Sequence, residues 1–374
     1  MLPEKLKLNL FDRMSIKTMR YVSSVPRKEA TGLVKRVYDM IAEDFFINGS
    51  LTSHSKVPAL LAGVWTGGRE SMLVDDHLDR TTKEAMTAVV SRLNECAYCG
   101  DMLVSLVHAG QEHRAARNII DEREDQVPDP VLQERLTWTK GVITGQRSAG
   151  IPLPFPVEAL PEVIASVLAI SHINRFSHVV MDGSPVSPLL GSKSIKGLSL
   201  RAFGHELKST KTKPLTPDRT AGLLPEADLP EDMGWASDNP RIARSVSRWA
   251  AAIEREALKV VPPEVKRFVE DNLNSWDGSP MPLFRSWVDD ETVSLSSHER
   301  DLARFALIVG KSAPQIDERM VYSVREDEEQ FIRLLAWASF AGARRVAEIA
   351  SLRASTPSPV HTLADPLTHR AAAC

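Results

Sequence analysis

The chain has 374 residues, 43% of them hydrophobic and 25% charged, so it is long enough to build one large domain or two of ordinary size. The formal net charge of −3 gives no basic footprint for nucleic acid, and no uninterrupted apolar stretch approaches the roughly 20 residues of a membrane span. Three cysteines cannot form an extracellular disulfide framework at this length. We therefore expect a soluble, cytoplasmic protein that binds neither nucleic acid nor membrane.

Helical periodicity dominates the sequence, whereas the alternating pattern of β-strands is scarce. The segment 31–45 places Leu33, Val37 and Ile41 on one stripe, and the segments 160–180 and 327–350 show the same spacing of apolar residues. The sequence predicts an all-α fold.

Composition changes along the chain and suggests two helical halves. Residues 190 to 240 are rich in Pro, Gly, Ser and Lys and have poor periodicity, which is typical of a linker or a long excursion. We expect these parts in chain order: an N-terminal extension (1–30), a helical domain (31–189), the linker or excursion (190–240), a second helical domain (241–351) and a tail (352–374).

The two halves can be aligned with one inserted residue. Glu84 then falls on Glu299, and the segment 96–99 falls on 311–314, where no cysteine stands. This predicts a duplicated unit in which the second copy has lost its thiols. In the cysteine-free copy, Glu299 is expected to be structural.

The stretch NECAYCGDMLVSLVHAG (94–110) holds two of the three cysteines, Cys96 and Cys99. If a helix begins near Asn94, a good N-cap residue, both thiols lie in its first turn on one face. They are then close enough for a disulfide, and the helix N-terminus favours a thiolate. A low-pKa thiol beside a second thiol suits peroxide reduction or dithiol exchange.

The spacing of the two cysteines has other possible meanings. A c-type haem site needs histidine directly after Cys99, where Gly100 stands, and structural zinc needs four ligands, whereas only His108 lies nearby. A thioredoxin-like site needs a strand before the motif, and the preceding residues are helical in pattern. Packing of two small buried residues between helices remains open beside the redox interpretation.

An acidic residue twelve positions before Cys-x-Tyr-Cys, preceded by SHSKVPALLAGVWTGGRESMLVDDHLDRTTKEA, resembles the carboxymuconolactone decarboxylase and alkylhydroperoxidase D superfamily. The resemblance covers residues 31–182, including VIASVLAISHINRFSHVV, and more weakly 240–350. It implies an all-helical homo-oligomer without metal or organic cofactor. For the peroxidase branch it implies Cys99 as the activated thiol, Cys96 as its disulfide partner that meets an external dithiol reductant, Glu84 as proton acceptor and Tyr98 as supporting donor.

The sequence departs from the family motif at one position. The family has histidine four residues after the second cysteine, and Leu103 stands there. A relay from Glu84 would require the chain to fold back near Asn94, so that the carboxylate faces residues 103 to 105. His172 and His178, which lie outside the motif, are candidates for the missing base. A histidine in such a helix more commonly has a structural role with its hydrogen bonds satisfied. Glu84 itself is either a general base or a buried carboxylate with a structural partner.

These observations predict a thiol-dependent oxidoreductase that reduces a hydroperoxide, or exchanges disulfides, through Cys96 and Cys99. Two alternatives stay open. The first is a non-redox enzyme of the decarboxylase type acting on a small organic acid or lactone, and the second is a non-catalytic scaffold or interaction protein.

Overall fold

The computed structural model describes residues 16–146, 152–184 and 193–355. Within this part of the chain the secondary structure is helical, apart from an isolated antiparallel bridge between Met19 and Met181. The all-α prediction is confirmed. Much of the expected N-terminal extension and of the tail, including Cys374, lies outside the described residues.

The helices follow one another through both halves of the chain. The longer ones are α2 (Gly32–Asp44), α4 (Pro58–Gly68), α5 (Arg80–Leu93), α6 (Ala97–Ala109), α7 (His113–Ile120), α8 (Pro130–Thr144), α9 (Leu160–Val180), α10 (Lys193–Leu207), α11 (Pro240–Ala257), α12 (Pro263–Ser275), α14 (Ser297–Ser312) and α16 (Glu328–Ser355). The shorter ones are α3 (Gly49–Thr52), α13 (Ser286–Glu291), α15 (Glu318–Val324), the π-helix η1 (Arg69–Leu73) and the 3-10 helices η2 (Glu124–Gln126), η3 (Val157–Ala159), η4 (Lys208–Lys211), η5 (Glu231–Ala236) and η6 (Ala313–Gln315).

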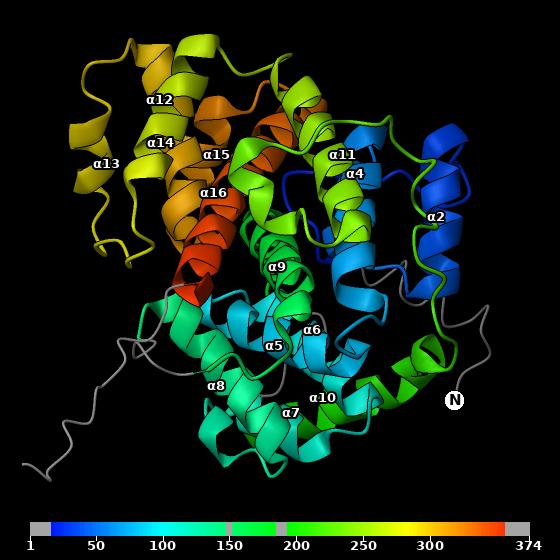
Figure 1. The fold of residues 1–374 in the computed structure, drawn as a ribbon. Helices are drawn as coiled ribbons and strands as arrows, with labels where there is room; N and C mark the ends of the chain where they lie inside the picture. The colour runs from blue at the N-terminus through cyan, green and yellow to red at the C-terminus, as the bar shows by residue number, and fades with distance from the viewer. Residues whose placement is uncertain (1–15, 147–151, 185–192, 356–374) are drawn as a thin grey trace, which may run out of the picture.

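Helix α9 forms the centre of the molecule. Every residue from Pro161 to Ser177 is buried, and Figure 1 shows α16 packed along α9, with α5 and α6 below it. Val157–Val180 is long and apolar enough to cross a membrane, yet 94% of its most apolar window is buried by other helices. That degree of enclosure is what the core helix of a folded protein shows.

The two halves meet along α9 and α16. In the first half α5 packs on α9, and in the second half α14 packs on α16. The aligned glutamates have different partners, since Glu299 closes a capping box with Ser296 at the start of α14, whereas Glu84 pairs with cations. The duplication therefore stays a prediction, and Glu299 has the structural role expected of it.

The described part of the 190–240 segment is more ordered than its composition suggests. Helix α10 packs along α6, burying Leu200 and Leu207, and Lys196 forms a 2.8 Å ion pair with Asp101. A Cβ on Gly204 would lie only 2.8 Å from the Cβ of His108. The small residues that suggested a flexible linker here permit a close approach of two helices.

A sharp turn joins α5 to α6. Glu95 takes a left-handed conformation (φ 55°), its N–H donates to Arg92 O, and the Cys96 N–H donates to Ser91 O. These two bonds form a Schellman motif, which satisfies the last carbonyls of α5. Asn94 is thus the C-cap of α5 and not the start of the cysteine helix, which begins at Ala97 with Cys96 as its N-cap. The fold-back near Asn94 that a relay would need is present.

Candidate functional site

The two cysteine sulfurs lie 2.7 Å apart at the N-terminus of α6. Cys96 is the N-cap, and its Sγ accepts a hydrogen bond from the Cys99 N–H at 3.4 Å. Both residues are free cysteines and are buried. A movement of roughly 0.7 Å would bring the sulfurs to the bonded distance of about 2.05 Å, so the two sulfurs are close enough to form a disulfide.

Burial controls the acidity of Cys99. Removal from water, followed by the neighbouring Cys96 sulfur, raises the pKa of the Cys99 thiol well above its usual range, and the nearby Ser177 hydroxyl opposes this weakly. The Cys99 Sγ also lies 4.0 Å from the carbonyl oxygen of Ile173 on α9. The isolated Cys99 thiol therefore resists ionisation.

A cavity of about 70 Å³ reaches Cys99. Its wall is mostly apolar and comes from α4, η1, α6, α9 and the segment around α3. Leu103, one turn after Cys99 on the same face of α6, is part of this wall. The position where the family has histidine thus contributes apolar surface next to the thiol.

Tyr98 also lines the cavity and is buried. Its hydroxyl oxygen accepts a 3.1 Å hydrogen bond from the N–H of Gly49, the first residue of α3. Burial raises the pKa of Tyr98, so the phenol stays neutral near pH 7. In this arrangement Tyr98 fastens α3 beside the cavity.

Glu84 is fully buried and lies among cations. Arg80 donates to it at 2.8 Å, and Lys211 of η4 pairs with its other oxygen. Lys211 also bonds Thr81 and lies close to Gly110, which follows the last turn of α6. Gly110 is eleven residues beyond Cys99, about 16 Å along the helix. The structure thus places Glu84 near the C-terminal end of α6, far from Cys99. Its pairing with two cations is typical of a structural carboxylate.

Four histidines form two pairs. His108 contacts His113 through their Nδ1 atoms at 3.0 Å, and His172 contacts His54 through their Nε2 atoms at 3.4 Å. The second pair is buried, with the His54 ring stacked on Phe176. Burial lowers the pKa of His54 to about 3 and that of His172 well below its usual value. Because Ile173 and Ser177 are the α9 residues beside Cys99, neither His172 nor His178 occupies the place of the missing base.

Sequence comparison supports the family suggested by the motif. The chain is 26% identical over 335 residues to the protein of Mycobacterium tuberculosis named alkyl hydroperoxide reductase Rv2159c, an alignment that covers 88% of this chain and 94% of the relative. The name of this relative agrees with the alkylhydroperoxidase D-like family that the motif resembles. No family model matches the sequence, and no solved structure matches it.

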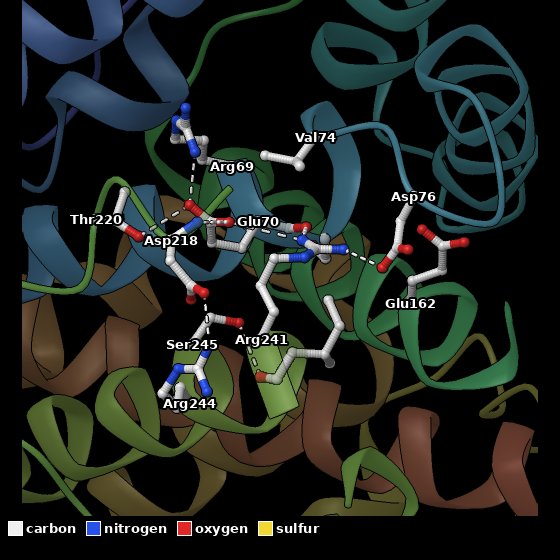
Figure 2. Close-up of polar contacts among 12 residues, drawn as sticks. Arg69, Glu70, Val74, Asp76, Glu162, Asp218, Thr220, Arg241, Arg244 and Ser245 are labelled. Atoms are coloured by element: carbon white, nitrogen blue, oxygen red, sulfur yellow. Dashed lines mark hydrogen bonds and ion pairs between the residues drawn. The ribbon is translucent and has the colours of Figure 1, made fainter. Parts of the chain in front are cut away.

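A buried ionic network lies beside the cavity at Cys99, and the sequence analysis did not predict it. Arg69, in the π-helix η1, lines the cavity and donates to Asp44 at 2.7 Å and to Glu70 at 2.6 Å. Glu70 in turn accepts from the Asp218 N–H at 3.1 Å and the Thr220 hydroxyl at 3.2 Å. Figure 2 shows Glu70 between these groups and Arg241, which also reaches Asp76.

This network fastens the segment before α11 to the wall of the cavity. Arg69 bonds three acceptors, the third being the Thr216 carbonyl oxygen at 2.9 Å. A guanidinium whose donors are paired in this way has few hydrogen bonds left to offer a substrate. In the sequence this network is marked by the adjacent pair Arg69 and Glu70. Such pairs are too common in proteins to predict a buried ionic network.

Proposed function

We propose that this protein is a thiol peroxidase that reduces apolar organic hydroperoxides through Cys96 and Cys99. The observation that carries the proposal is the 2.7 Å sulfur pair with Cys99 in the wall of an apolar cavity. The name of the Mycobacterium tuberculosis relative supports the same class of reaction. The apolar wall of the cavity favours an organic hydroperoxide over hydrogen peroxide.

The first step is attack by the Cys99 thiolate on the terminal peroxide oxygen. The O–O bond breaks, the alcohol leaves after taking up a proton, and Cys99 becomes a sulfenic acid. Cys96 then attacks the Cys99 sulfur, which forms the disulfide and releases water. An external dithiol reduces this disulfide and is itself oxidised to a disulfide, so the electrons balance in each cycle.

Cys96 supplies the base that position 103 lacks. Its sulfur caps α6 and lies in contact with the Cys99 sulfur, so a thiolate on Cys96 can accept the Cys99 proton directly. The pair then shares one proton and one negative charge. Because burial raises the pKa of Cys99, turnover should increase with pH above neutrality.

The roles of the two thiols are separable by single-turnover experiments in a Cys374→Ser background. With cumene hydroperoxide, Cys96→Ser should consume one equivalent slowly and stop at a sulfenic acid that dimedone traps on Cys99. Cys99→Ser should consume none. Equal consumption by both variants and by a variant lacking both thiols would refute the proposal, and faster reaction with hydrogen peroxide than with cumene hydroperoxide would refute the substrate class.

A non-redox enzyme acting on a small organic acid or lactone is the second candidate. Leu103 and the raised pKa of Cys99 favour it, since both work against thiol chemistry. Under this alternative Cys99→Ser would leave activity near normal. A non-catalytic scaffold would show no turnover with any substrate and would co-purify with a specific partner.

We also propose a cytoplasmic location and self-association for this protein. Several large apolar side chains are exposed, and Leu283 and Phe284 are 90% and 82% exposed in one loop. Neighbouring apolar groups of this kind are typical of a contact between subunits. Sedimentation velocity of the wild type and of a Leu283→Ser/Phe284→Ser variant tests this point.

A further inference from the structure

A second cavity, separate from the one at Cys99, lies between the two halves of the chain. It is a cleft of about 620 Å³. One side comes from the α5–α6 turn, the end of α8 and α9, and the other from residues 276–283, the end of α14 and α16. None of the side chains used in the thiol chemistry lines it.

Two amide groups on its inner wall have hydrogen-bonding capacity left over. Asn174 is 1% exposed, its Oδ1 accepts from the Ser91 hydroxyl at 3.0 Å, and its Nδ2 has no partner among the described residues. The Nδ2 of Asn94, in the turn before Cys96, is likewise buried without a described partner. A buried donor without an acceptor reduces the stability of the fold. A ligand that brings an acceptor would therefore bind favourably, because the donor is already removed from water.

The residue beside Asn174 adds a positive charge. Arg175 is 6% exposed, and its guanidinium donates to the carbonyl oxygens of Gly310 at 2.9 Å and Ser171 at 3.1 Å. Within the described residues it has no carboxylate partner. Burial lowers the pKa of Arg175 to about 10, which leaves the group charged at neutral pH. A buried cation held only by carbonyls attracts an anion strongly.

The other charges around the cleft do not neutralise Arg175. Glu95 is exposed at the rim, and Lys311 is already paired with Asn272 and lies 3.9 Å from Glu291. Arg353 also lines the cleft and donates to the Val142 carbonyl oxygen at 2.8 Å. The inner wall is therefore positive and rich in N–H donors.

Most of the remaining wall is apolar. Trp276, Met281, Val346 and Ile349 contribute to it. A ligand that fits both parts has one anionic group and an apolar body.

We propose that this cleft binds an organic carboxylate with an apolar body, whose carboxylate lies on Arg175 and the Nδ2 of Asn174. The planar guanidinium suits the two oxygens of a carboxylate, and the apolar body lies against Trp276 and its neighbours. This site goes beyond the proposed peroxidase function and does not depend on it.

The test is isothermal titration calorimetry with octanoate, octanol and inorganic phosphate on the full chain. A Leu103→Trp substitution fills the cavity at Cys99, so that binding there is not counted. We expect octanoate to bind this variant at least about tenfold more tightly than octanol or phosphate do. Adding Arg175→Met should weaken octanoate about tenfold or more, whereas Arg123→Met, which removes an exposed arginine, should not.

Asn174→Ala provides a second variant should Arg175→Met fail to fold, because it removes the unpartnered Nδ2 and loses one hydrogen bond, the one from Ser91. It should weaken octanoate several-fold and leave octanol unchanged. Equal binding of octanoate and octanol would refute recognition of the carboxylate by Arg175. Equal binding of phosphate and octanoate would refute recognition of an apolar body. Octanoate binding that survives both variants unchanged would overturn the placement.

Discussion

Replacing Leu103 by histidine is the sharpest test of how this site differs from its family. The residue lies one turn after Cys99, on the same face of α6, in the wall of the apolar cavity. An imidazole there would lie about 5 Å from the Cys99 sulfur, given a rise of about 6 Å between the two residues. It would offer the thiol a nitrogen base that the wild type lacks.

The expected increase in the thiolate population of Cys99 follows from Coulomb's law. At about 5 Å and an effective dielectric constant of about 20, an imidazolium and a thiolate attract by about 3 kcal/mol. That energy raises the thiolate population at neutral pH by about two orders of magnitude. Burying the imidazole costs roughly 1–3 kcal/mol of folding free energy, so the variant should be less stable and more reactive.

The assay follows thiolate absorbance against pH, and the rate of cumene hydroperoxide consumption, in a Cys96→Ala/Cys374→Ser background. Leu106→His is the matched control, since Leu106 lines the same cavity about 10 Å along the helix from Cys99. Its effect should be about tenfold smaller, because the interaction energy is halved at twice the distance. An unchanged Cys99 titration in Leu103→His, or equal effects of the two histidines, would refute the reasoning.

Three further predictions concern stability. Lys83→Met should reduce the free energy of unfolding by about 3–5 kcal/mol in urea titrations, because it leaves Glu162, 3.0 Å away, buried and unpaired; Lys83→Met/Glu162→Leu should recover most of the loss. His54 and His172 stay neutral when folded but bind protons near pH 6.5 when unfolded, so this pair should lower the free energy of unfolding by about 2.5 kcal/mol from pH 7.5 to 5.5, and His172→Leu should remove about half of the contribution of the pair. Glu95→Gly should stabilise the chain by about 1 kcal/mol, seen as a higher thermal midpoint, since glycine adopts the left-handed conformation without strain; a lower midpoint would contradict this account of the turn.

Local sequence patterns predicted the helices well. The segments 31–45, 160–180 and 327–350 match Gly32–Asp44, Leu160–Val180 and Glu328–Ser355 closely, because a 3.6-residue apolar stripe determines both a helix and the face that it buries. The start of the cysteine helix was placed too early, since Asn94 suits both an N-cap and a C-cap. Only the bonds from Glu95 and Cys96 back to α5 show which of the two it is.

The sequence by itself determined the all-α class and the adjacency of Cys96 and Cys99, because each depends on spacing along one chain. Only the tertiary structure decided what surrounds them. The partners of Glu84 come from the same helix and from Lys211, more than a hundred residues away, and Arg69 is held by residues from η1, α2 and the segment before α11. Such charges find one another through packing, and burial then sets their chemistry: the same desolvation that raises the pKa of Cys99 keeps His54 and His172 neutral.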